Sequence, residues 1–112
     1  MYSIKKLPEK CIVLLNGELD LTYRDRLRKL LEEVEDPDVT IDLMMVEYID
    51  STIIHELLRL VKAKRHCSFV LARSSQVARI IDLLKLSEVL EIDYRELAEL
   101  DDEIAWIPLR TG

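Results

Sequence analysis

The sequence predicts a single α/β domain built on a mixed, mostly parallel sheet of four to five strands with about four helices. Three observations predict this fold class. The chain has 112 residues, enough for one domain with a real hydrophobic core. It is 49% hydrophobic and 34% charged, as compact folded proteins are. Apolar runs of strand length alternate with segments of helical periodicity, which implies right-handed crossovers between parallel strands.

The N-terminal segment predicts a pair of strands. The stretch "YSIKKL" alternates weakly, and the turn signal Pro8-Glu9-Lys10 follows it. The next stretch, "CIVLLNG", is a continuous run of branched apolar residues. It indicates a buried strand that stops at Asn16-Gly17.

A helix and a third strand are expected next. The stretch "TYRDRLRKLLEEVED" has apolar residues at helical spacing. Thr22 and Asp25 fit a capping box at its start, and Asp36-Pro37 fits its end. "VTIDLMMV" (39–46) then predicts a strand that carries Asp42 on one face or at an edge.

The second half of the chain predicts three more helices and two more strands. A helical stripe follows the third strand within "YIDSTIIHELLRL" (48–60), and "SFVLA" (68–72) predicts a buried strand. The next helix is expected in "SSQVARIIDLLKL", with Ser74 or Ser75 as its cap. A short edge strand over 88–92 and a terminal helix over 94–107 complete the order β-β-α-β-α-β-α-β-α.

The whole chain, residues 1–112, is expected to be one domain with a C-terminal extension over about 101–112. This extension carries the only tryptophan, Trp106. It is expected either to pack on the sheet or a helix, or to serve self-association or partner binding.

Charge and hydropathy exclude several classes of protein. The net charge of −6 argues against nucleic-acid binding, and seven acidic residues against one arginine lie within 91–103. No apolar run approaches the roughly 20 residues that span a bilayer, so no membrane insertion is expected. The first residues lack the apolar core of a secretion signal, which indicates a cytoplasmic protein.

The sequence predicts neither a metal site nor a cofactor. Cys11 and Cys67 each open an apolar run, as buried cysteines do, and no metal-ligand spacing links them to a histidine. Gly17 and Gly112 are the only glycines, so a Gly-rich phosphate loop is excluded.

No catalytic residues are expected, and we do not predict an enzyme. Asp50, Ser51 and His55 could be imagined as a triad. However, Ser51 and His55 are one turn apart on the outside of a helix, with no nucleophile elbow or oxyanion-hole motif. An enzymatic activity that uses Ser51 or Cys67 is therefore considered only as something to exclude by assay.

The junction "YIDSTII" raises the main question about function. Asp50 is followed by two hydroxyls, Ser51 and Thr52, although one side-chain oxygen suffices to cap a helix. Redundant capping is one explanation. The other is that a hydroxyl at this junction is accessible to a kinase, and that its phosphate would be tolerated by the helix N-terminus but felt by a docked partner.

Three stretches of the chain, spread over about residues 4–100, resemble the STAS domains, and specifically the stand-alone anti-sigma factor antagonists. "VLLNGELDLTYRDRLRKLL" is similar to the family's strand, Gly-Glu-Leu-Asp turn and first helix. "VTIDLMMVEYIDST" is similar to its central strand and phosphorylation loop, and "SFVLARSSQVARIIDLLKLSEVLEI" to the part that closes the fold. In this order and spacing the three stretches are fairly specific.

The resemblance implies a binding protein. Its expected partner is an anti-sigma factor with a Ser/Thr kinase fold; a phosphatase and a second copy of the chain are further expected partners. By family register Ser51 is the phosphorylation site, with Thr52 as the second choice. The residues expected to contact the partner are Asp20, Thr22, Asp50, Ser51, Thr52 and His55.

One departure keeps a second role open. The family pattern continues Gly-Leu-Gly after the hydroxyls, whereas this chain has Ile53, Ile54 and His55. A bulky branched side chain is therefore expected near the acceptor. The alternative role is a non-phosphorylated STAS scaffold or an accessory subunit of a transporter or stress-signalling complex.

Overall fold

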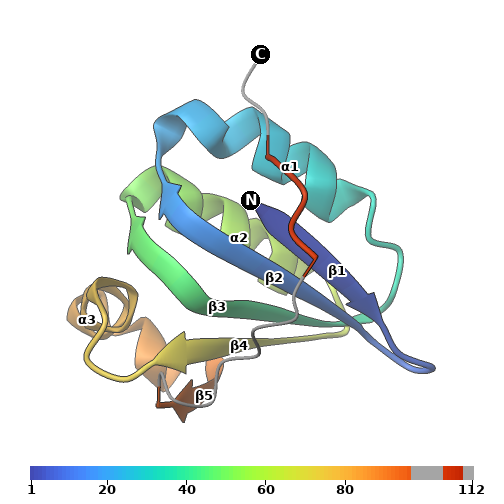
Figure 1. Ribbon diagram of the computed structural model, residues 1–112. Helices are drawn as coiled ribbons and strands as arrows, with labels where there is room; N and C mark the ends of the chain where they lie inside the picture. The colour runs from blue at the N-terminus through green and yellow to red at the C-terminus, as the bar shows by residue number, and fades with distance from the viewer. Residues whose placement is uncertain (97–104, 110–112) are drawn as a thin grey trace.

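The computed structural model describes residues 1–96 and 105–109 of the chain (Figure 1). Five strands form one sheet in the order β1-β2-β3-β4-β5, with β1 antiparallel to β2 and all other neighbours parallel. The predicted fold class is confirmed, with three α-helices and two 3-10 turns in the described residues. The elements are β1 (Tyr2–Lys6), β2 (Cys11–Leu19), η1 (Leu21–Tyr23), α1 (Arg24–Glu32), β3 (Asp38–Ile49), α2 (Ser51–Ala63), β4 (His66–Ala72), α3 (Gln76–Leu83), η2 (Leu86–Glu88) and β5 (Glu91–Arg95).

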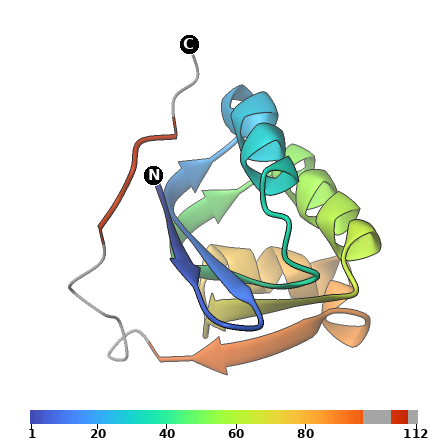
Figure 2. The ribbon, with the colours of Figure 1, turned by 90° about the vertical axis from the view of Figure 1, so that its right-hand side faces the viewer.

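The helices share one face of the sheet. Each crossover from β2 onward moves one strand further in the same direction, and right-handed crossovers of this kind place their helices on the same side. Buried side chains of α1, α2 and α3, such as Leu27, Leu57 and Val77, accordingly belong to one core cluster with Ile41 and Phe69 of the sheet. Figure 2 shows α1 and α2 side by side on this face. None of the described helices is long and apolar enough to cross a membrane.

The second strand runs further than its sequence predicts. The predicted stop at Asn16-Gly17 is wrong, because β2 continues to Leu19 and stays paired with β3. Register shifts occur between Leu14 and Asn16 and between Gly17 and Glu18. Gly17 adopts φ +87°, a left-handed conformation that favours glycine at such bulges. The turn residues therefore bend the strand and do not end it.

The helix ends differ from the predicted ones in their caps. The capping box of Thr22 and Asp25 is wrong: η1 comes first, and Asp20 caps it by accepting the Thr22 N–H at 2.9 Å. The following helix, α1, has no side-chain cap at its N-terminus. At α3 the cap is Ser75, whose hydroxyl accepts the Ala78 N–H at 3.0 Å.

The last predicted strand is displaced by three residues. Residues 86–88 form η2, and β5 covers 91–95, so the predicted bounds of 88–92 are wrong. Lys85 takes a left-handed conformation (φ +59°) that ends the preceding helical segment before η2.

The predicted terminal helix over 94–107 is wrong at both ends, and its middle, 97–104, lies outside the described residues. Tyr94 belongs to β5, while Ile107 forms an isolated antiparallel bridge with Tyr2. Leu109 is buried in the main core. Residues 105–109 therefore pack beside β1, where Figure 1 draws them in red.

Candidate functional site

The two predicted partner-contacting segments meet at the carboxyl ends of β2 and β3. These strands are parallel neighbours, and their last residues, Leu19 and Ile49, are paired. Both strands end at this point: β2 is followed by η1, and β3 is followed by α2. The topology thus brings together segments about 30 residues apart in the sequence.

Asp50 joins the two segments through its carboxylate. One oxygen, Oδ1, accepts the Ile53 N–H at 3.0 Å and so caps α2. The other, Oδ2, accepts the N–H of Leu21 in η1 at 2.9 Å. Asp50 alone supplies the helix cap, which answers the question raised by the two hydroxyls.

The hydroxyl residues are therefore not redundant caps. Ser51 is the first residue of α2 and is exposed, whereas Thr52 is half-buried. Within the described residues, neither hydroxyl forms a hydrogen bond with another protein group. His55 is exposed one turn further along the helix.

A side chain from α3 supports the strand end that carries the site. The Gln76 amide oxygen accepts the Ile49 N–H at 3.1 Å, and its nitrogen donates to the Ile49 carbonyl at 3.3 Å. The ladder between β3 and β4 ends at Asp42. Gln76 thus substitutes for a neighbouring strand at the residue before Asp50.

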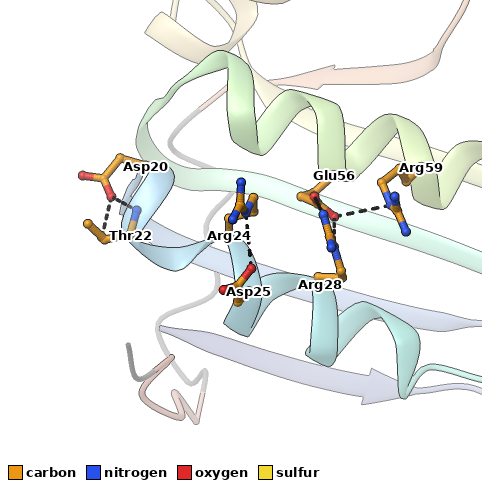
Figure 3. Close-up of polar contacts among 7 residues, drawn as sticks. All are labelled: Asp20, Thr22, Arg24, Asp25, Arg28, Glu56 and Arg59. Carbon is orange, nitrogen blue, oxygen red and sulfur yellow. Dashed lines mark hydrogen bonds and ion pairs between the residues drawn. The ribbon is translucent and has the colours of Figure 1, made fainter. Parts of the chain in front are cut away.

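Asp20 and Thr22 form a local turn at the start of η1 (Figure 3). Asp20 Oδ1 accepts both the Thr22 N–H at 2.9 Å and the Thr22 hydroxyl at 2.5 Å. These bonds, the hydroxyl first, lower the pKa of Asp20 below its ordinary value and keep it ionised. Thr22 is exposed beside this carboxylate.

The two isoleucines that follow the hydroxyls do not lie on the surface beside Ser51. Ile53 is fully buried, and Ile54 is also in the core. Their side chains extend α2's apolar stripe under the helix. The helix thus turns both side chains away from the solvent side, where Ser51 is exposed.

An ion pair between α1 and α2 was not foreseen from the sequence (Figure 3). Arg28 binds Glu56 through two bonds, Nε to Oε2 at 3.0 Å and Nη2 to Oε1 at 2.5 Å. Arg59 approaches the same carboxylate at 3.7 Å. The Glu56 side chain is only 2% exposed and lines a groove of about 280 Å³ between the helices.

The Arg28–Glu56 pair is electrostatically matched. Hydrogen bonding to Arg28 holds the pKa of Glu56 below its ordinary value, and the pKa of Arg28 is raised in turn. The pair joins α1, which follows η1, to α2, whose first turn carries Ser51. A signal was present in the sequence: Glu56 lies between Ile53 and Leu60 on an otherwise apolar stripe.

The remaining reactive groups lie elsewhere or are already engaged. Cys11 and Cys67 both pair with Val39, at the end of the sheet opposite Ser51. Burial raises the pKa of both thiols, that of Cys67 to about 11. Each oxygen of Asp50 accepts a backbone N–H group.

Several known proteins share this architecture. An anti-sigma factor antagonist from Mycobacterium paratuberculosis superposes with a TM-score of 0.77 at 20% identity, covering 88% of each chain. The phosphorylated form of SpoIIAA, a Bacillus cell fate determinant, gives a TM-score of 0.62 at 16% identity over 88% of this chain and 95% of that one. A sulfate transporter family protein from Wolinella succinogenes gives 0.63 at 21% identity over 84% of each.

At these identities the structural likeness shows the fold. A search of curated proteins found no significant match. The sequence itself matches the STAS domain family over residues 2–100, nearly the whole length of the chain. The chain therefore belongs to the STAS domain family.

Proposed function

We propose that the chain is an anti-sigma factor antagonist, a binding protein without catalytic activity. It docks on an anti-sigma factor with a Ser/Thr kinase fold through η1 and the N-terminal turn of α2. Phosphorylation of Ser51 by that partner releases it. The observation that carries this proposal is the exposed Ser51 hydroxyl at the first turn of α2, beside a second loop that Asp50 holds in place.

The setting of Ser51 supports its role as the acceptor. Its hydroxyl is exposed and unengaged among the described groups, and the cap that the helix needs comes from Asp50. A phosphate here adds about −1.5 to −2 charge next to Asp50 and near Asp20 in the adjoining segment. The helix N-terminus tolerates an anion, whereas a docked partner meets like-charge crowding and a desolvation cost.

Thr52 provides a matched comparison. It follows Ser51 directly but is half-buried, so a kinase reaches its hydroxyl less readily. Thr52→Ala should leave phosphate incorporation intact, and Ser51→Ala should abolish it.

The test measures partner affinity and phosphate incorporation together. Wild type and Ser51→Ala should bind the kinase-fold partner equally. Ser51→Asp should bind at least tenfold more weakly. Because Asp50 is the cap, Ser51→Ala should change the free energy of unfolding by less than about 0.5 kcal/mol. Equal affinity of wild type and Ser51→Asp for a confirmed partner would refute the switch.

A scaffold or accessory role is the second candidate. It is favoured by the likeness to the sulfate transporter family protein, which is similar in extent to the likeness to SpoIIAA. Affinity purification from the native cell separates the two. Recovery of transporter subunits without a kinase-fold protein, and no phosphate on Ser51, would replace the antagonist role with this one.

A further inference from the structure

Asp50 does more than a helix cap requires. A serine or asparagine would satisfy the Ile53 N–H with one oxygen. Only a carboxylate presents a second acceptor, and here that oxygen accepts the Leu21 N–H, 29 residues away in the chain, at 2.9 Å. The second bond contributes nothing to α2 itself. Its effect is on the position of η1.

The residue held in this way is apolar and exposed. Leu21 has 57% of its surface accessible, although Leu19, two residues earlier, is fully buried. Between them the chain leaves β2 and enters η1, where Asp20 accepts the Thr22 N–H and Asp50 accepts the Leu21 N–H. Leu21 is therefore presented outward from a turn that is fixed at two points.

We propose that Asp50 is a positioning residue that holds Leu21 as the apolar anchor of the docking surface beside Ser51. This inference rests on the proposed function and adds the residue that the partner grips. The partner should present an apolar pocket with cationic groups at its rim, complementary to Leu21 and to the ionised Asp20 next to it.

The first experiment examines the bridge without any partner. Asp50→Asn and Asp50→Ser each keep one oxygen for the Ile53 N–H and lose the acceptor for Leu21. Amide hydrogen exchange at Leu21 should become at least tenfold faster in both variants, while exchange at Ile53 should change little. Unchanged exchange at Leu21 would overturn the bridge.

The second experiment measures affinity for the kinase-fold partner. Leu21→Ser and Asp50→Asn should each weaken binding about tenfold, and the double variant should be no weaker than the worse single one, because both act through the same contact. The control is Leu83→Ser, since Leu83 is 80% exposed at the far end of α3 and should not affect binding.

The outcomes are distinguishable. Strictly additive losses would overturn the positioning role, as would a Leu21→Ser variant with wild-type affinity. If the wild-type chain binds no kinase-fold partner, the proposed function and the anchor fall together. In that case, comparing the amide exchange rates of Leu21 and Ile53 still tests whether Asp50 links η1 to α2.

Discussion

Replacing Arg28 by methionine should destabilise the protein more than replacing its buried partner, Glu56, by glutamine. Arg28→Met keeps a long apolar stem but leaves the Glu56 carboxylate, 2% exposed, without its bidentate partner. Glu56→Gln leaves Arg28, whose side chain is 38% exposed, free to reach water while the Gln oxygen still accepts a bond. The loss of stability depends on whether the charge that remains unpaired is buried, as in Glu56, or can reach water, as in Arg28.

The magnitudes follow from burial. Breaking a buried ion pair costs about 3–5 kcal/mol. Arg59, at 3.7 Å, remains as a weak partner, so about 2–3 kcal/mol is expected for Arg28→Met. Glu56→Gln exchanges a charged hydrogen bond for a neutral one, at about 1 kcal/mol. For a chain of this size these losses lower Tm by roughly 10 °C and 4 °C.

The pH dependence provides an independent check. In the wild type the pKa of Glu56 is lowered, so its stabilisation is complete above the ordinary glutamate pKa and is lost as pH falls through the folded-state value. In Arg28→Met the burial of the Glu56 carboxylate, opposed only weakly by Arg59, raises that pKa, and protonation relieves the penalty on acidification. The stability difference should therefore be large at pH 7 and shrink towards pH 4.

Urea unfolding of the wild type and both variants at the two pH values measures these differences. A Glu56→Gln variant that loses at least as much as Arg28→Met would refute the reasoning, as would an Arg28→Met loss independent of pH.

Three further predictions concern groups away from the proposed docking site. Cys67, with its pKa raised to about 11, and Cys11, which is buried, should both label slowly at pH 8; rapid labelling in the folded protein would contradict their placement. Burial raises the pKa of Asp42, so the ionised carboxylate costs stability above the folded-state pKa. Asp42→Asn should therefore raise Tm at pH 7, and this gain should disappear below about pH 4 in thermal melts. Leu109→Ala should cost about 2–3 kcal/mol of unfolding free energy, measured by urea titration, whereas no loss would mean that the 105–109 segment does not pack on the core.

Periodicity was sufficient to predict the five strands and the first three helices, because apolar stripes such as Ile53, Leu57 and Leu60 show which face of an element is buried. The ends of the elements were harder to predict. Asn16-Gly17 has the composition of a turn. Because both residues pair with β3, they form a bulge within the strand and do not end it. Local composition does not carry information about strands contributed from elsewhere in the chain.

The same distinction applies to the candidate site. The family register predicts that Ser51, Thr52 and Asp20 belong to one partner-contacting surface. The second bond of Asp50, the Gln76 amide and the Arg28–Glu56 pair join residues 27 to 29 positions apart. Such contacts depend on side-chain geometry that spacing within one element does not reveal.

The bridge between Ile107 and Tyr2 has a consequence for aggregation. An open sheet has two edges whose free backbone groups can recruit another strand. On the β1 edge, Tyr2 exchanges both hydrogen bonds with Ile107, at 2.8 and 2.7 Å, and its neighbours Lys5 and Lys6 add charge. Along β5, Glu91, Asp93 and Arg95 are charged and exposed. The chain thus discourages templated growth at both edges, and shortening it before Ile107 should make it more prone to form fibrils.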